Sequence, residues 1–290
     1  MSEDRTVPAR IRVAFQGELG AFSEEAVHRF FGEGVVPVPR RDFSEVGRAV
    51  VERDVDFGLL PIENTLAGSV VGSYDVLAGG ELRILGEVIT PIHHCVLGLP
   101  GASLQSLKRI LSHPVALMQC TRFLRALPGV DAVAVYDTAG AAKDIAAQAD
   151  PTQAAIAARR AAGRYGLDLL AEDVEDRPDN QTRFLVVTPR DGGKSLPPHL
   201  DRQRNSAKSA VLVETANQPG ALLQILSPFS ERSINLSKLE SRPAGEPWTY
   251  RFFIEFDADA GSPAAEQALA EIHARAVNLQ VLGTYPRWED

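Results

Sequence analysis

Thr182 and Arg183 stand side by side at the start of an apolar run, 184–187, and they follow an acidic, proline-bearing turn at 176–180. In open α/β folds, ligands gather at such junctions between a loop and a strand. A guanidinium group binds carboxylates, and a neutral hydroxyl beside it can donate a hydrogen bond to a departing oxygen. The pair therefore indicates a site for a small anionic substrate that loses an oxygen.

Three further polar clusters fall where the sequence predicts a strand end or a helix start. Helix starts offer free backbone N–H groups and a partial positive charge, and both suit carboxylates. Each cluster alone is more simply explained as a cap or a turn, but their recurrence at the same kind of position favours one shared binding site. The clusters are Gln16-Gly17 with Ser23, Glu63-Asn64-Thr65 with Gly68-Ser69, and Ser112-His113 with Gln119.

Strands and helices alternate along the first 165 residues, which predicts mostly parallel sheets with crossover connections. The pattern occurs twice, so it predicts two α/β lobes with a central cleft, a favoured place for a small ligand. Ser23 is expected to cap the first helix. Predicted strands are 11–15, 35–38, 57–62, 82–89, 93–99, a strand ending at 111–114, and 130–136; predicted helices are 23–31, 43–50, 104–110, 115–127, one ending near 149, and 154–165.

Residues 190–207 form a polar linker without a hydrophobic period. The linker separates an N-terminal domain at 10–189 from a C-terminal domain at 208–287. The C-terminal elements run strand, helix, strand, strand, helix, strand, which is the split βαβ, ferredoxin-like order. Such a small sheet gains stability from pairing with a second copy, so we expect a homodimer or a homotetramer. The strands are expected at 209–214, 234–240, 250–256 and 279–285, and the helices at 220–230 and 263–276.

Several stretches, taken in order, resemble the signature stretches of prephenate dehydratase, and the C-terminal domain resembles the phenylalanine-binding ACT domain that accompanies it. The resemblance covers residues 11–286. It implies an α/β fold: a two-lobed, periplasmic-binding-protein-like catalytic domain with a central cleft, followed by a ferredoxin-like (βαββαβ) ACT domain. The stretches are 15–23, 61–69, 112–114 with Gln119-Cys120, and 180–184 in the catalytic domain, and 220–223 and 240–243 in the ACT domain.

The resemblance implies conversion of prephenate to phenylpyruvate, water and carbon dioxide on the route to L-phenylalanine. Aromaticity drives this elimination, so no cofactor and no metal are required. Thr182 is the essential group in the family, and we expect it to donate a hydrogen bond to the leaving hydroxyl. A threonine hydroxyl is a very weak acid, so a relay through Glu63 or His113 is expected, and the sequence leaves both open.

The remaining site residues are expected to bind the substrate. Asn64 and Gln119 fall on family positions where an amide matters for activity, and they are expected to donate to carboxylate or pyruvyl oxygens. Arg183 either holds a substrate carboxylate or forms a structural ion pair with Asp176 or Asp179. The binding shell is completed by Ser23, Thr65, Ser112 and Gly20.

The ACT resemblance implies a site for L-phenylalanine, acting as a feedback inhibitor, between two ACT domains of a dimer. A helix start can bind the carboxylate of the amino acid, and leucines can line its side-chain slot. The alternative is that these residues only start a helix and end a strand. The expected effector residues are Asn217, Gly220, Ala221, Leu222, Leu223, Glu240, Ser241 and Arg242.

Composition limits the other possibilities. The 290 residues carry a net charge of −8 and no basic stripe, which argues against nucleic acid or a membrane surface as a partner. Two cysteines and a polar N-terminus without a signal peptide favour the cytoplasm. His93 and His94 are predicted to point to opposite faces of a strand, which disfavours a metal site. An arogenate-preferring dehydratase and a non-catalytic small-molecule sensor remain the alternative functions.

Overall fold

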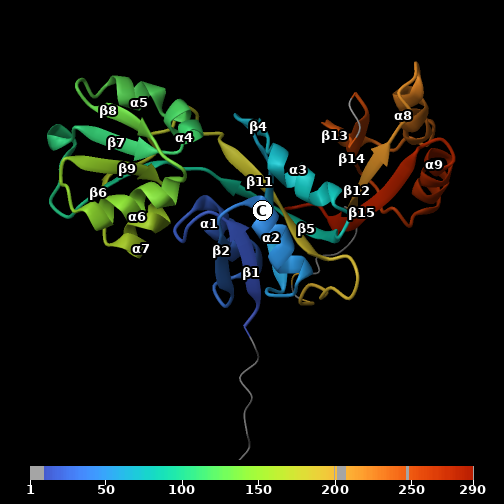
Figure 1. The fold of residues 1–290 in the computed structure, drawn as a ribbon, viewed down its shortest axis with the longest axis horizontal. Helices are drawn as coiled ribbons and strands as arrows, with labels where there is room; N and C mark the ends of the chain where they lie inside the picture. The colour runs from blue at the N-terminus through green and yellow to red at the C-terminus, as the bar shows by residue number, and fades with distance from the viewer. Residues whose placement is uncertain (1–9, 199, 201–206, 246–247, 290) are drawn as a thin grey trace, which may run out of the picture. The chain divides into compact units, whose positions relative to one another are not determined.

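The computed structural model describes residues 10–198, 200, 207–245 and 248–289. Backbone contacts divide the chain into two compact units, one of residues 1–69 and 89–184, the other of residues 70–88 and 185–290. The first unit contains two α/β lobes, and the second contains the C-terminal block together with a helix and most of a strand from the middle of the chain (Figure 1). The fold is therefore the expected α/β fold with a ferredoxin-like C-terminal domain.

The sheet of the first lobe has the order β2-β1-β3-β11-β5, and β1 pairs in parallel with both β2 and β3. Its central strands are buried on both faces: Val13, Ala14 and Phe15 of β1 are fully inaccessible, as expected when helices cover a parallel sheet. The elements are β1 (Arg12–Gln16), α1 (Phe22–Phe31), β2 (Val36–Arg40), α2 (Phe43–Val51), β3 (Phe57–Asn64), β4 (Gly68–Ser69), β5 (Leu82–Pro91) and β11 (Gln181–Pro189).

The second lobe has its own five-stranded sheet, in the order β10-β6-β9-β7-β8. Helices α6 and α7 pack on one face of this sheet, while α4 and α5 pack on the other (Figure 1). The elements are β6 (Cys95–Gly98), a 3₁₀ turn (Leu104–Ser106), β7 (Arg109–Ser112), α4 (Pro114–Gln119), α5 (Thr121–Arg125), β8 (Asp131–Ala134), α6 (Thr138–Gln148), β9 (Gln153–Ala157), α7 (Arg159–Tyr165) and β10 (Asp168–Ala171).

The second lobe differs from the sequence prediction at several points. The predicted helix 154–165 is wrong: its first residues form β9, the central strand, where residues 154–157 are fully inaccessible. Alanine favours helices intrinsically, but packing between two helical layers overrides that preference here. The predicted helix 104–110 is one 3₁₀ turn followed by β7, and the predicted helix 115–127 is broken at Cys120 into α4 and α5.

The structure also corrects the predictions for Ser23 and for the pair His93 and His94. Ser23 does not cap α1: the cap is Ala21, and Ser23 is the second residue of the helix. His93 and His94 do not belong to a strand, because β6 begins at Cys95. They lie in one of the two segments that connect the lobes, where the backbone N–H of Val174 bonds to the carbonyl of His94 (3.0 Å).

In the second unit, an antiparallel sheet has the order β13-β14-β12-β15, which confirms the predicted split βαβ arrangement. Helices α8 and α9 cover one face of it. Phe253 points to the opposite face, where its ring packs on Tyr74 of α3 with centroids 5.1 Å apart. The remaining elements are α3 (Val71–Ala78), β12 (Ala207–Glu214), α8 (Ala221–Glu231), β13 (Leu236–Pro243), β14 (Tyr250–Phe256), α9 (Pro263–His273) and β15 (Asn278–Pro286).

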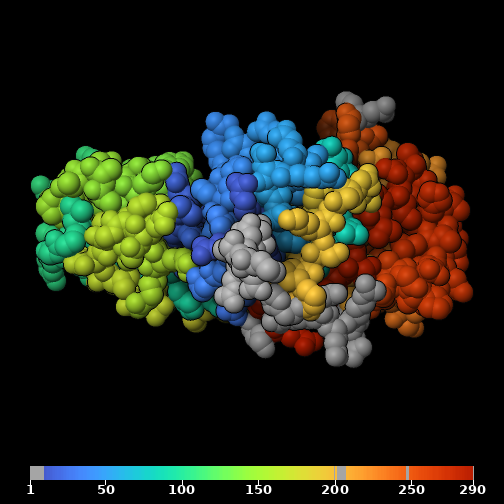
Figure 2. All heavy atoms as spheres, turned by 90° about the horizontal axis from the view of Figure 1, so that it is seen from below, coloured from blue at the N-terminus to red at the C-terminus, as the bar shows by residue number. Residues whose placement is uncertain are grey.

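The linker between the predicted domains is described only in part, at residues 190–198, 200 and 207. Ala207 already belongs to β12, whereas residues 190–198 and 200 form turns and irregular structure, and five of the eight residues from Asp191 to Pro198 are exposed. They lie on the face of the molecule seen in Figure 2. At its start, the Arg190 side chain bonds to the carbonyl of Gly80 (2.7 Å), within the second unit.

Candidate active site

Thr182 and Asn64 lie side by side at the ends of β11 and β3. The Asn64 Nδ2 atom is 2.9 Å from the Thr182 hydroxyl oxygen, and this is the one side-chain hydrogen bond of Thr182 within the described part of the chain. An amide NH₂ group has hydrogens to donate but accepts none. The hydroxyl of Thr182 can therefore only accept from Asn64, whose two Nδ2 hydrogens also face Asn180 Oδ1 (2.9 Å) and the Gln181 carbonyl (3.0 Å), and the Thr182 hydrogen remains available to another acceptor.

Two backbone groups fix which way the Asn64 amide faces. The Oδ1 atom of Asn64 accepts from the N–H of Leu66 (3.0 Å) and from the N–H of Ala67 (2.8 Å). Both groups are donors only, so the atom facing them must be the oxygen. The Nδ2 atom consequently faces Thr182, and the turn after β3 determines the polarity of the whole site.

Asn64, Asn180 and Gln119 close a ring of three amides. Asn64 Nδ2 donates to Asn180 Oδ1 (2.9 Å), Asn180 Nδ2 donates to Gln119 Oε1 (3.0 Å), and Gln119 Nε2 donates to Asn64 Oδ1 (3.4 Å). The ring joins strand β3, helix α4 and the segment before β11. One hydrogen on Gln119 Nε2 remains without a partner among the described residues, so it can serve a substrate oxygen.

His94 extends the ring through Gln119. The His94 Nε2 atom lies 2.9 Å from Gln119 Oε1, and the imidazole is almost completely buried, with the ring of Phe22 packed edge-on at 5.2 Å. Burial lowers the pKa of His94 below its usual value, although the bond to Gln119 and the charge of Glu175 act in the opposite direction. Asn180 and His94 are the functional candidates that the sequence prediction missed. Asn180 belongs to the 180–184 stretch, in which roles were predicted only for Thr182 and Arg183.

Glu63 and Arg183 form a charged pair beside the amides. An Arg183 terminal nitrogen lies 3.8 Å from a Glu63 oxygen, and the Glu63 side chain is 40% exposed. The two expected ion-pair partners of Arg183 are engaged elsewhere: Asp179 pairs with Arg177, and Asp176 binds the start of α5. Arg183 and Glu63 are thus neighbours in space. Arg183 directly follows Thr182 in the sequence, and Glu63 directly precedes Asn64.

Two other predicted residues, Ser112 and Thr65, have structural contacts of their own. Ser112 is fully buried and donates to the carbonyl of Ile156 (2.6 Å). Thr65 donates to the carbonyl of Asp179 (3.1 Å) and accepts from the N–H of Gln181 (3.0 Å), which fastens the turn after β3 to the segment before β11. These two hydroxyls position the site through the backbone, and substrate binding by either remains a prediction.

His113 and Asp137 stand at neighbouring helix starts of the second lobe. His113 caps α4 by accepting from the N–H of Val115 at Nδ1 (3.3 Å), and Asp137 caps α6 by accepting from the N–H of Gly140 (2.7 Å). Burial raises the pKa of the Asp137 carboxyl. With Nδ1 used in capping, Nε2 is the nitrogen through which His113 can exchange a proton.

Gly20 brings the first lobe against the second. Its φ is +94°, and a Cβ atom there would come within 2.9 Å of the Ala161 backbone in α7. Its N–H donates to the carboxylate of Glu24, so this group is already engaged. Tyr165 adds a second contact between the lobes by donating to the carbonyl of Leu19 (2.6 Å). The structure thus places Gly20 in the packing between lobes, near Ser23.

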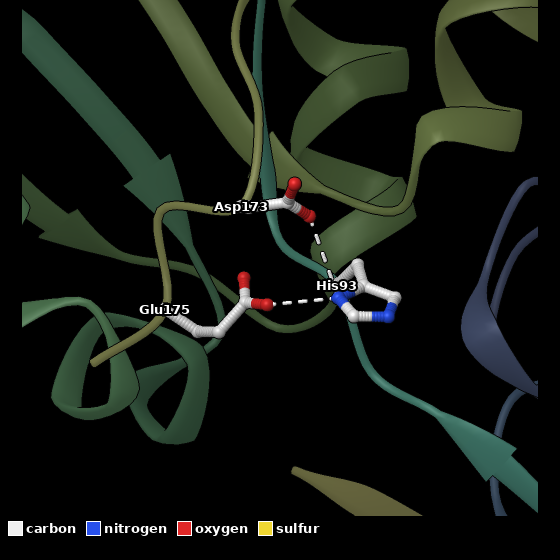
Figure 3. Close-up of side chains that lie close together, drawn as sticks. All are labelled: His93, Asp173 and Glu175. Carbon is white, nitrogen blue, oxygen red and sulfur yellow. Dashed lines mark hydrogen bonds and ion pairs between the residues drawn. The ribbon is translucent and has the colours of Figure 1, made fainter. Parts of the chain in front are cut away.

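One group of side chains in the described residues could hold a cation: His93, Asp173 and Glu175, whose ligand atoms lie within 4.8 Å of one another (Figure 3). The Nδ1 atom of His93 faces both carboxylates, at 2.9 Å from Glu175 and 3.4 Å from Asp173. Glu175 also accepts from the N–H of His94 (2.8 Å). A hydrogen bond joins His93 to Glu175 and an ion-pair contact joins it to Asp173, so the group cross-links the two segments between the lobes.

The predicted effector residues surround the start of α8 and the exposed edge strand β13. Gly220 precedes α8 with φ +81°, and Asn217 donates to the carbonyl of Trp248 (3.3 Å). Leu223 is 69% exposed. Arg242 lies 3.5 Å from Asp75 of α3. The structure places Asn217, Gly220, Ala221, Leu222 and Leu223 at the helix start, and Glu240, Ser241 and Arg242 on β13.

Two α/β lobes, a hydroxyl oriented by an amide at their junction, and a C-terminal ferredoxin-like domain define a two-lobed α/β enzyme with a regulatory domain. Residues 13–192 match the model of the prephenate dehydratase family, and residues 209–274 match the ACT domain. The chain belongs to the prephenate dehydratase family and carries a C-terminal ACT domain. The resemblance to this family that the sequence motifs indicated is confirmed.

Individual relatives support the same assignment. The chain is 37% identical over 296 residues to arogenate dehydratase/prephenate dehydratase 2, chloroplastic, of Arabidopsis thaliana, covering 99% of this chain and 75% of that protein. The solved prephenate dehydratase of Arthrobacter aurescens in complex with L-Phe is 33% identical, with a TM-score of 0.87 and coverage of 96% and 90%. A structure described as GqqA, a novel type of quorum quenching acylase, is 32% identical, with a TM-score of 0.85 and coverage of 96% and 98%.

Proposed function

We propose that the protein converts prephenate to phenylpyruvate, water and carbon dioxide, and that Thr182 donates to the departing hydroxyl. The observation that carries this proposal is the 2.9 Å contact between Asn64 Nδ2 and Thr182 Oγ1. Because Asn64 can only donate there, the Thr182 hydrogen is directed to another acceptor. A donor aimed at an oxygen that gains charge as its bond breaks stabilises the transition state more than the ground state.

The surrounding groups have separate tasks in this proposal. Arg183 and the free hydrogen of Gln119 Nε2 bind carboxylate or pyruvyl oxygens of the substrate. Asn64 contributes by orienting Thr182. Glu63 and His113 remain the two candidates that return a proton to the threonine: Glu63 neighbours Arg183, and His113 presents Nε2 from the start of α4. Ser23, Thr65, Ser112 and Gly20 shape the site around these groups.

We propose the domain limits 10–189 for catalysis, 190–207 for the linker and 208–287 for the ACT domain, with regulation by L-phenylalanine bound at the start of α8 and on β13. Exposed apolar side chains on this domain, Leu223, Leu239 and Val277, support assembly into a homodimer or homotetramer through the ACT domains. We place the protein in the cytoplasm. No helix among the described residues is long and apolar enough to cross a membrane.

Arogenate is the alternative substrate, because relatives of the chain are named as arogenate dehydratase/prephenate dehydratase. The test measures formation of phenylpyruvate from prephenate, and of phenylalanine from arogenate, by the purified protein, against samples without protein. Turnover of prephenate with the higher kcat/KM is expected, together with inhibition by added L-phenylalanine. A higher kcat/KM for arogenate would assign the alternative, and turnover of neither would exclude the proposal.

A further inference from the structure

His94 is a buried polar residue that the proposed reaction does not use directly. It lies in the segment connecting the lobes, its ring is packed against Phe22, and its backbone N–H donates to Glu175 (2.8 Å). Its Nε2 atom contacts the carboxamide oxygen of Gln119 at 2.9 Å. Burying a polar imidazole costs free energy unless its hydrogen bonds compensate for the lost water. The contact of His94 with the ring of three amides therefore points to a role in the fold or in the site.

The direction of the amide ring determines the tautomer of His94. The N–H groups of Leu66 and Ala67 fix the oxygen of Asn64, which places Asn64 Nδ2 against the oxygen of Asn180. Asn180 Nδ2 must then face the Gln119 oxygen. A carboxamide oxygen only accepts, so the hydrogen between Gln119 and the imidazole belongs to His94 Nε2. The other ring nitrogen, Nδ1, is buried and has no partner among the described residues.

We propose that His94 is a positioning residue for the dehydration: as the neutral Nε2–H tautomer, it holds the Gln119 carboxamide and, through the amide ring, the orientation of Asn64 against Thr182. The inference rests on the proposed function of Thr182. Without the Nε2 donor, the Gln119 oxygen retains only Asn180, and the carboxamide can rotate and present its NH₂ group to the wrong partner. His94 touches none of the reacting atoms in this account.

The neutral form follows from the surroundings. The titratable groups that act on His94 are Glu175 and His93, both from the segments between the lobes, and the other contacts are the uncharged side chains of Phe22 and Gln119. Burial lowers the pKa of His94, which keeps the ring uncharged at neutral pH. A neutral ring has one hydrogen, and the amide ring places it on Nε2.

Two amide substitutions at His94 separate the effect of its Nε2 hydrogen-bond donor from the effect of the size of the imidazole. In His94→Gln the amide nitrogen reaches the position of Nε2, whereas in His94→Asn it reaches only the position of Nδ1. We expect His94→Gln to keep kcat on prephenate within about 3-fold of wild type, and His94→Asn to lower it about 10- to 100-fold, as displaced positioning groups do. Equal kcat losses in both folded variants would overturn the proposal.

Non-additivity distinguishes positioning through Gln119 from a general effect on folding. We expect His94→Asn to lower kcat/KM by less than about 3-fold when Gln119 is already alanine, because residues that act as a unit are strongly coupled. Full additivity would show that His94 acts independently of Gln119. Melting curves of each variant establish that the kcat/KM values being compared come from folded protein.

The tautomer can be measured without any turnover. Nitrogen-15 NMR of histidine-labelled wild type, with the His94 signals assigned by their absence in His94→Gln, is expected to show a neutral ring protonated at Nε2 at pH 7. A ring protonated at Nδ1, or a cationic ring, would overturn the proposal even in an active enzyme. If the Nε2–H form is found but the wild type turns over no prephenate, the proposed function is wrong, while the hydrogen-bond network from His94 to the three amides is confirmed.

Discussion

The Nδ2 atom of Asn64 lies 2.9 Å from the hydroxyl oxygen of Thr182, across a separation of 118 positions in the sequence. The contact forms because β3 and β11 are neighbours in the sheet of the first lobe, so the ends of the two strands are adjacent. The asparagine is held by the turn that follows its own strand. A local backbone feature thereby sets the direction of a hydroxyl that comes from the far end of the catalytic domain.

Asn64→Asp is expected to abolish most activity with little change in shape. The new carboxylate oxygen would accept the Thr182 hydrogen, so the hydroxyl would no longer be directed at the substrate, and Asn180 would lose its donor. We expect kcat to fall at least about 100-fold, the scale found for removing one transition-state donor. The measurement is prephenate turnover, with Asn278→Asp at an exposed position of the C-terminal domain as the control. Retention of more than a tenth of the activity would contradict the orientation of Thr182 described above.

Gly20→Ala tests the packing between lobes. Two costs combine at this position: a positive φ, and a Cβ within 2.9 Å of the Ala161 backbone. Gly101→Ala is the matched control, because Gly101 also has positive φ (+81°) but open space around it. We expect the control to lose about 1 kcal/mol of unfolding free energy, and Gly20→Ala to lose more and to have lower kcat/KM. Equal melting temperatures for the two variants would argue against close contact of the lobes at Gly20.

The pH dependence of stability provides a test of the buried His94. Its pKa is lowered in the folded state by burial, so the unfolded chain binds more protons between that lowered value and the ordinary value of 6.5. Stability contributed by the neutral ring is therefore complete above 6.5 and is lost as the pH falls through this window. His94→Gln removes the titration, so the advantage of wild type over this variant should shrink between pH 7.5 and pH 5.

Denaturant unfolding at both pH values measures the difference. His273→Gln, at an exposed position on α9, is the control and should show no such change. An advantage of wild type over His94→Gln that grows on acidification would mean that the imidazole is stabilised as a cation.

Helix α3 offers a route by which the ACT domain can influence catalysis. Arg242 on β13 lies 3.5 Å from Asp75 of α3, and α3 begins two residues after β4, which pairs with Glu63 and Asn64. If L-phenylalanine alters β13, Asp75→Asn should weaken the inhibition. The Asp75 side chain is 62% exposed, so we expect the half-inhibitory concentration of L-phenylalanine to rise only about 2- to 5-fold, with unchanged basal kcat.

Inhibition curves for wild type, Asp75→Asn and Glu266→Gln make the comparison, the last changing an exposed carboxylate on α9. Identical curves for all three proteins would exclude the contact between Arg242 and Asp75 from the regulatory route.

Sequence patterns predicted the elements that depend on local signals. The order of strands and helices after the linker is confirmed, because the short apolar runs in β12 and β14 and the proline at the start of α9 are local features. The alanine-rich segment 154–165 was assigned wrongly because the burial of β9 between two layers of helices is a tertiary effect. A window of sequence contains no information about which layers will enclose it.

The site was predictable residue by residue but not as a network. Thr182, Asn64 and Gln119 stand in recognisable motifs, and the structure brings them together. Asn180 and His94 were missed because their importance lies in contacts with residues that are 25 to 116 positions away in the chain. Amide orientation and the histidine tautomer depend on which donors and acceptors meet, and this is settled only when the lobes fold.

If the hydroxyl hydrogen of Thr182 assists the departing group, Thr182→Ser and Thr182→Val must differ sharply in turnover. Serine keeps the hydroxyl, while valine keeps the shape and removes it. With prephenate binding measured separately by calorimetry, we expect Thr182→Val to bind prephenate but to lose at least about 100-fold in kcat, and Thr182→Ser to keep most of the activity. A kcat for Thr182→Val within about 10-fold of wild type would show that the Thr182 hydrogen does not assist the departing hydroxyl.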